Sequence, residues 1–339
     1  MTSPILPALS AIVLCAAALY FGGGIFAPVA FSLFVIAIVW PLQKILEGRI
    51  PRLFALLLTL GATVLVLGAF AWTLVWSLGM VGRWLAANLG RFYALYAQTT
   101  EWLDGHGIFV AGLLGEHFNV LALVRLFQDV AARVNGLVGF ALMVIIFTML
   151  GLLEVGDFRQ KLRALHHSAR ADRVLGAIAT ISRKFRKYLL VRTLASILTG
   201  LVVWVFALAL NVELAAAWGV LAFALNYIPV IGPLFATLLP TLFSAAQFES
   251  WQMALLVFLG LNTIQFVIGS YLEPRFSGSA LAISPFVVVL AVFFWTFLWG
   301  IPGAFIGVPV TIAMLSACEL NPATRWIATL LSGPGRDGA

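Results

Sequence analysis

The 339-residue chain is 63% hydrophobic and only 10% charged, with a formal net charge of +7 and a mean hydropathy of +1.07. Soluble domains carry about 25% charged residues, so a chain with so little charge cannot cover a surface in water. We therefore expect an all-α membrane protein and not a soluble enzyme. Half of the 20 Lys and Arg residues lie within 159–192, which is typical of a cytoplasmic segment beside lipid headgroups and argues against nucleic-acid binding.

Uncharged runs predict the membrane spans of the first half. A spanning helix needs about 20 mostly apolar residues, and such runs lie near residues 5–21, 25–43, 53–78 and 134–153. The first run is similar to a signal peptide, but no basic residue precedes it, so we interpret it as a retained helix. Residues 1–153 are thus predicted to form an N-terminal membrane scaffold.

Residues 83–133 interrupt this scaffold with balanced charge, four basic and four acidic side chains. Apolar residues at nearly helical spacing on both sides of the polar sequence 104–107 predict two amphipathic helices. We expect them outside the cytoplasm, either at the membrane surface or against a neighbouring subunit.

The basic segment 154–192 sets the expected orientation. Its apolar residues recur every three or four positions, which predicts an amphipathic cytoplasmic helix that runs directly into a fifth span at 193–212. The positive-inside rule then places 44–52, 159–192, the N-terminus and the tail 321–339 in the cytoplasm. The expected location is the cytoplasmic membrane of a bacterium or archaeon.

The second half predicts a transport unit at 193–320. Two long uncharged stretches, 214–247 and 283–318, are broken by Gly and Pro, and a plain span at 250–272 lies between them. The second stretch is broken at 300–303 and again at 307–309. The arms of the first have about 14 residues, or roughly 21 Å of helix, which is less than the roughly 30 Å hydrocarbon core. Re-entrant hairpins in an inverted repeat fit these lengths. Full antiparallel crossings fit the same charge pattern. The whole chain is predicted to have about eight hydrophobic segments.

The break in the first stretch supplies the first candidate site residues. A chain interrupted by Pro leaves backbone carbonyls free, and protein-shielded carbonyls inside a membrane can bind a solute or an ion. Asn226, Pro229, Gly232 and Pro233 are therefore candidate substrate-binding residues. The alternative is that Asn226 only caps the broken helix.

Further polar candidates lie on the following segments. Asn262 and Gln265 are three residues apart on the span 250–272 and could bind a solute or hydrogen-bond a neighbouring helix. Ser284, Pro285 and Gly303 belong to the second hairpin, where Ser284 is equally suited to be an N-cap.

Glu273 and Arg275 end the span 250–272. An ion pair between them is a candidate gate or coupling element, because charged groups in membranes are costly and often functional. A solvated pair at the membrane surface is the alternative. No metal-ligand spacing, P-loop or hydrolase motif is present, so we expect no metal, no cofactor and no enzymatic activity.

Three segments also carry a family resemblance: NYIPVIGP (226–233), EPRFSGSALAISPFVVVL (273–290) and WGIPGAFIGVPVTIAM (299–314). Residues 188–314 resemble the autoinducer-2 exporter family of membrane proteins, whereas the first half resembles it in layout only. The resemblance implies transport of small solutes, with export of the quorum signal autoinducer-2 as the namesake activity. It also implies varied cargo, because some members are described as sodium/proton antiporters.

Three functions remain open at this stage. The leading hypothesis is a homo-oligomeric secondary transporter, whose partners are lipid and a small polar solute. Its hairpins would close around the solute by alternating access, and an elevator-like motion is one possible mode. A cation/proton antiporter would use Glu273 as its titratable carboxylate. A non-transporting scaffold would bind a partner through the helices of 83–133.

Overall fold

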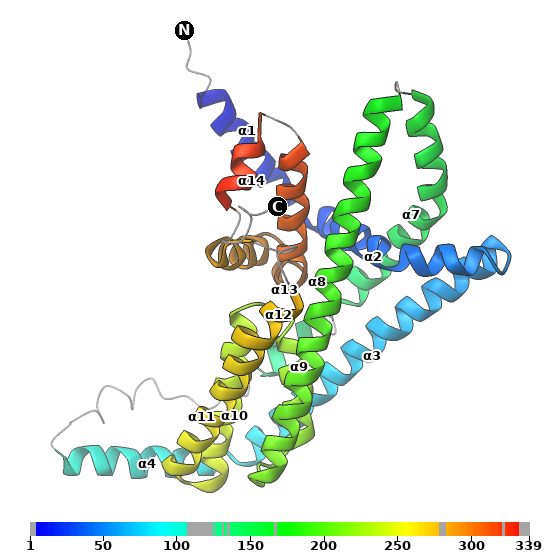
Figure 1. Cartoon of the computed structure of the whole chain (residues 1–339). Helices are drawn as coiled ribbons and strands as arrows, with labels where there is room; N and C mark the ends of the chain where they lie inside the picture. The colour runs from blue at the N-terminus through cyan, green and yellow to red at the C-terminus, as the bar shows by residue number, and fades with distance from the viewer. Residues whose placement is uncertain are drawn as a thin grey trace. The chain divides into compact units, whose positions relative to one another are not determined.

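The computed structural model describes residues 5–106, 125, 127–130, 132–133, 136–165, 168–277, 283–320 and 323–331. Over these residues the regular structure is helical, without a β-strand, so the predicted all-α class is confirmed. The elements, shown in Figure 1, are α1 (Ile5–Phe21), α2 (Gly23–Glu47), α3 (Arg52–Ala87), α4 (Leu89–Gly105), α7 (Val138–Leu165), α8 (Ser168–Ala209), α9 (Ala215–Leu225), α10 (Ile231–Phe248), α11 (Trp251–Phe266), the π-helix η1 (Val267–Leu272), α12 (Glu273–Ser277), α13 (Pro285–Leu320) and α14 (Arg325–Leu331).

Seven helices of the described residues are long and apolar enough to cross a membrane. They are Gly23–Glu47, Arg52–Ala87, Val138–Leu162, Ala171–Ala209, Ile231–Phe248, Trp251–Phe276 and Pro285–Glu319. Less than half of each span is buried inside the protein, and many large apolar side chains are exposed along them. Lipid is the solvent that suits such surfaces, so the chain is a multi-pass membrane protein.

The contacts divide the chain into two compact units. Unit 1 comprises Met1–Val66, Val138–Val191 and Ser277–Ala339, and unit 2 comprises Leu67–Leu137 and Arg192–Phe276. Two of the four boundaries fall inside the long helices α3 and α8. In α8 the basic segment and the fifth predicted span form one 42-residue helix.

Unit 1 is organised around α2, which packs against α1, α7 and α13. Two basic residues hold the basic part of α8 within this unit. Lys184 lies 3.6 Å from the Glu319 carboxylate and donates to the Ser316 hydroxyl at 2.9 Å. Arg186 donates to the carbonyl of Ala37 at 2.9 Å.

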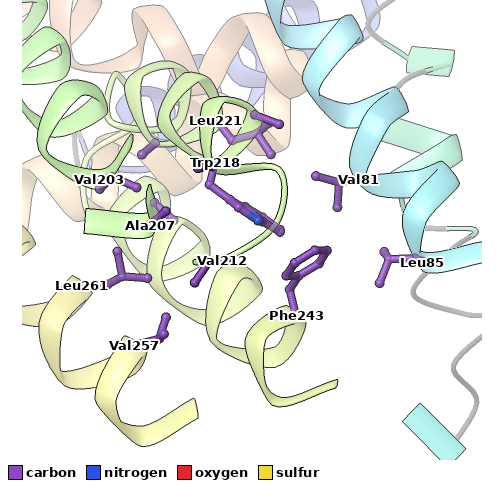
Figure 2. Packing of buried hydrophobic residues seen from close by; sticks show 14 of the residues in the cluster. Val81, Leu85, Val203, Ala207, Val212, Trp218, Leu221, Phe243, Val257 and Leu261 are labelled. Atoms are coloured by element: carbon purple, nitrogen blue, oxygen red, sulfur yellow. The ribbon is translucent and has the colours of Figure 1, made fainter. Parts of the chain in front are cut away.

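Unit 2 has a large apolar cluster, whose members labelled in Figure 2 come from five helices and from the loop that holds Val212. Figure 2 shows the rings of Trp218 and Phe243 in the middle of this cluster, between side chains of α3 and α11. The rings meet edge to face, with centroids 5.1 Å apart, an arrangement that adds to the energy of burial. The labelled members are Val81, Leu85, Val203, Ala207, Val212, Trp218, Leu221, Phe243, Val257 and Leu261.

The first predicted hairpin is formed by α9 and α10, which pack against each other. Its arms differ from the two equal arms expected from the sequence. α9 has 11 residues and α10 has 18, or about 17 Å and 27 Å of helix. The expected arm lengths are therefore wrong, because an uncharged run does not show where its helices end.

A strained turn joins these arms. Val230 has φ 66° and ψ −56°, and the carbonyl of Pro229 accepts a hydrogen bond from the N–H of Ile231 at 2.7 Å. This geometry is the rare form of the γ-turn, and a positive φ is unusual for a β-branched residue. Backbone strain of this kind concentrates at functional sites.

The second hairpin lies within α13, where Gly300 breaks the helix with φ 61° and ψ −139°. The arms 285–299 and 301–320 touch, since the Trp295 indole donates to the Thr311 hydroxyl at 3.2 Å. The prediction of a second break at 307–309 is wrong, because the helix continues through Pro309. Membrane helices tolerate such prolines when neighbouring groups satisfy the freed backbone.

Each hairpin has, just after its turn, a glycine with no room for a Cβ. A Cβ at Gly232 would overlap the carbonyl oxygen of Leu225, and a Cβ at Gly303 would overlap that of Trp295. In each case the second arm begins so close to the end of the first that only glycine fits.

We predict that Gly232→Ala destabilises the protein by about 1–3 kcal/mol, because its Cβ has no room beside Leu225. The melting temperature of the purified protein in detergent would measure this. Gly68→Ala is the matched control, since a Cβ there meets nothing within 4 Å. Equal melting temperatures for the two variants would contradict the close approach.

Candidate functional site

Three of the buried polar residues of unit 2 lie on one face of α8. Arg192, Ser196 and Thr199, called the polar stripe here, follow each other at steps of four and three and are buried, so they share a helix face. Val203 and Ala207 continue the same face and belong to the apolar cluster. The face therefore changes from polar to apolar after Thr199.

The strongest interaction of the stripe is an ion pair. Nη1 of Arg192 donates to both carboxylate oxygens of Glu273, at 2.5 Å and 2.7 Å. The side chains are 7% and 23% exposed, so the carboxylate keeps some access to its surroundings while the guanidinium has almost none. Removing either charge would leave the other without a partner in an apolar unit.

The π-helix η1 brings Glu273 to this position. Leu261 and Ile268 lie on the buried face of the span, and an uninterrupted α-helix would place residue 272 next on that face. A π-turn contains one additional residue, so Glu273 takes that place instead. π-turns occur frequently at functional sites.

The turn of the first hairpin binds the same stretch of α8. The Asn226 amide nitrogen donates to the Ser196 hydroxyl at 3.2 Å, and both groups are buried. The Tyr227 hydroxyl donates to the Thr193 hydroxyl at 2.9 Å. Asn226 also directly follows α9 as its C-cap, in helical geometry, so the same residue caps the helix and binds Ser196.

Five buried polar atoms of unit 2 have no hydrogen-bond partner among the described residues: Ser77 Oγ, Arg192 Nε, Thr199 Oγ1, Trp218 Nε1 and Gln265 Nε2. Leaving such a group unsatisfied costs about 1–3 kcal/mol. Two of these atoms, Arg192 Nε and Thr199 Oγ1, belong to the polar stripe, which therefore retains hydrogen-bonding capacity that unit 2 does not use itself.

Polar contacts also close the base of the first hairpin. The Gln247 side chain accepts from the N–H of Glu213 at 2.8 Å and donates to the Asn211 carbonyl at 2.9 Å. The Trp84 indole donates to Glu213 at 2.5 Å and lies 3.9 Å from the Phe243 ring. The two ends of the hairpin are thus held together beside the apolar cluster.

The remaining candidates on the first hairpin and on α11 have other surroundings. Pro229, Gly232 and Pro233 form the turn itself and the first residues of α10. Asn262 is exposed and donates only to the carbonyl of Phe258 in its own helix. Gln265 has its amide nitrogen buried, so Asn262 and Gln265 do not share surroundings.

The expected ion pair between Glu273 and Arg275 is wrong. Arg275 is exposed and lies 4.1 Å from the ring of Tyr271, whereas Glu273 binds Arg192. Residues two positions apart do not face each other on a helix.

Ser284, Pro285 and Gly303 belong to unit 1. Ser284 immediately precedes α13, where its N–H donates to the Leu331 carbonyl at 3.2 Å. Pro285 is the exposed first residue of α13, and Gly303 packs beside Trp295.

Sequence reasoning missed Arg192, Thr193 and Ser196. Arg192 is the last of the ten basic residues in 159–192, and its place directly before an uncharged span was the available signal. Its partner lies 81 residues further along the chain, which no local pattern reveals. Of the amphipathic helices expected in 83–133, α4 covers Leu89–Gly105, and the second lies largely outside the described residues.

Comparisons with known proteins agree on one family. The model of the AI-2E family transporters matches residues 9–321. The AI-2 transport protein TqsA of Escherichia coli K12 is 31% identical over 323 residues, which cover 95% of this chain and 92% of that protein. A provisionally named transport protein of Haemophilus influenzae is 26% identical over 95% of this chain and 94% of its own length. One of Borreliella burgdorferi is 36% identical over 52% of this chain and 50% of its own length.

We predict that Arg192→Met lowers the free energy of unfolding by about 3 kcal/mol, because it leaves Glu273 without a counter-charge. The double variant Arg192→Met/Glu273→Gln should recover most of this loss, since it removes both charges. Melting temperatures of the purified proteins give the comparison, with Arg275→Met as the control at an exposed arginine. A double variant that is no more stable than the single one would refute the pairing.

Proposed function

The chain belongs to the AI-2E family of transporters, and from this premise we propose that it is a secondary transporter that exports a small polar solute by alternating access. The name of its relative TqsA suggests autoinducer-2 or a similar signal molecule as cargo. The observation that carries the proposal is the polar stripe of α8, with its buried ion pair to Glu273.

The polar stripe is costly to bury. Charged and polar groups inside a membrane protein are expensive, and they mark solute and ion pathways. An apolar face would serve packing equally well, as Val203 and Ala207 do on the same helix. We propose that the stripe, Asn226 and Glu273 bind solute, and that the apolar cluster separates this site from the opposite side of the membrane.

The orientation follows from charge. The basic residues of 159–192 favour the cytoplasm, and Arg192 ends this segment. We therefore propose that the polar stripe opens to the cytoplasm, that the apolar cluster lies on the external side, and that both termini are cytoplasmic. Export requires this orientation, with the solute site open to the cytoplasm, in the conformation whose external side is closed.

A re-entrant first hairpin is consistent with the contacts along α8. Its turn binds Ser196 and its base binds Asn211, and these residues are separated by about 22 Å of helix. This is less than the roughly 30 Å hydrocarbon core. Val230 and Gly300 both have a positive φ, and each is followed by a tightly packed glycine, which supports the proposed inverted repeat.

We further propose that residues 1–153 act as the scaffold and 193–320 as the moving transport unit, in a homo-oligomer that the scaffold holds together. This functional division differs from the division by contacts, in which α3 and α8 each contribute to both units.

Sodium/proton antiport is the second candidate, and Glu273 is the observation that favours it, as a carboxylate beside the buried stripe. Because both of its oxygens are bound by Arg192, it is poorly placed to exchange protons for cations. Sodium-dependent pH changes in proteoliposomes, present in the wild type and absent in Glu273→Gln, would reverse this ranking.

We predict that Asn226→Ala reduces export about tenfold, because it removes a buried hydrogen bond at the proposed site. The measurement compares small molecules, including autoinducer-2, in the medium of cells that produce the wild type, the variant or neither. Asn262→Ala is the matched control, since Asn262 is exposed and bonds only to its own helix. If the wild-type protein leaves the medium unchanged, export is not the function. If Asn226→Ala exports fully, Asn226 does not belong to the solute site.

A further inference from the structure

Arg192 has a donor edge that its ion pair does not use. Both oxygens of Glu273 lie on Nη1, whereas Nε is buried and has no partner among the described residues. A guanidinium binds planar acceptor pairs most effectively through a fork of two adjacent nitrogens. The edge of the guanidinium that contains Nε is therefore not engaged by Glu273.

We propose that this edge of Arg192 binds acceptor oxygens of the transported solute while Nη1 remains on Glu273. The inference rests on the proposed transport function and assigns Arg192 a direct role in solute binding, beyond its ion pair. An arginine held by a carboxylate on one side is oriented for a ligand on the other, which reduces the entropy that binding must overcome.

Two hydroxyl groups extend the site along the same face. Ser196 accepts from Asn226 and keeps its own O–H donor, and Thr199 Oγ1 has no partner among the described residues. At 1.5 Å per residue they lie about 6 Å and 10 Å along the helix axis from Arg192. This spacing suits a small solute with several oxygen atoms.

The charge of the site selects the class of solute. Arg192 and Glu273 neutralise each other, so an ion of either sign would enter an apolar unit without a counter-charge, at a high cost. The solute class that fits is small, uncharged and rich in hydroxyl and carbonyl oxygens. The buried atoms of the stripe have almost no exposed surface, so the solute enters when the site opens.

Arg192→Lys tests the role of the unused edge. Lysine keeps one positive charge for Glu273 but has no planar fork. The probes are autoinducer-2, erythritol and ribose as uncharged solutes, and acetate and lactate as anions, each tested for an increase in the melting temperature of the purified protein. We expect at least one uncharged probe to stabilise the wild type, and Arg192→Lys to weaken its apparent affinity about tenfold or more with the ligand-free melting temperature nearly unchanged.

Thr199→Val is the second variant, in case lysine alters the fold. It removes a buried hydroxyl that lacks a partner, so the ligand-free protein should be at least as stable as the wild type. The same probe should nevertheless bind more weakly. Arg275→Lys is the control and should bind like the wild type, because Arg275 is exposed.

The inference is overturned if Arg192→Lys and Thr199→Val bind the uncharged probes as the wild type does, if only anions stabilise the wild type, or if no uncharged probe does. Export measured in cells separates this inference from the proposed function. Normal export by Arg192→Lys would contradict the role of the guanidinium in solute binding but not the proposal of transport. No export by the wild type would contradict the proposal of transport itself.

Discussion

Unit 2 has to bury one ion pair inside an apolar protein, and its other features are consistent with that constraint. Arg192 is almost fully buried, and its counter-charge comes from a different helix. The π-turn η1 brings Glu273 to the required face, and the hairpin turn supplies Asn226 and Tyr227 to neighbouring hydroxyls of α8. A pair of this kind adds little to stability compared with apolar packing, so its presence is better explained by function.

The apolar cluster and the polar stripe depend on each other because they occupy one face of α8. After Thr199 the face becomes apolar, and Val203 and Ala207 pack with Trp218 and the other rings. A helix that changes character along one face can bind a polar solute at one end and exclude water at the other. Alternating access requires at least this asymmetry in any one conformation, with a solute site at one end and a region closed to water at the other.

Uncharged runs located the seven described helices that are long and apolar enough to cross a membrane, because charge is so costly in a bilayer. The predicted first span, 5–21, forms the 17-residue helix α1, which is not one of these seven. Asn226 was recognised because Pro229 follows it and breaks the helix. The arms of the hairpins were misjudged, since nothing inside an uncharged run marks the last turn of α9. Arg192 was missed because it resembles the other basic residues of its segment, and only the fold brings Glu273 to it. Long-range pairs of this kind leave no trace in local periodicity.

If the polar stripe is the solute path, Ser196 must become accessible from the cytoplasm. A Ser196→Cys variant would be made with Cys15 and Cys318 replaced by serine, which leaves a single thiol, and treated with a membrane-impermeant maleimide. We predict labelling in inside-out vesicles, where the cytoplasmic face is accessible, and slower labelling when autoinducer-2 or another exported solute is present. A variant that still exports but is labelled from neither face, or is labelled at the same rate with solute, would contradict it.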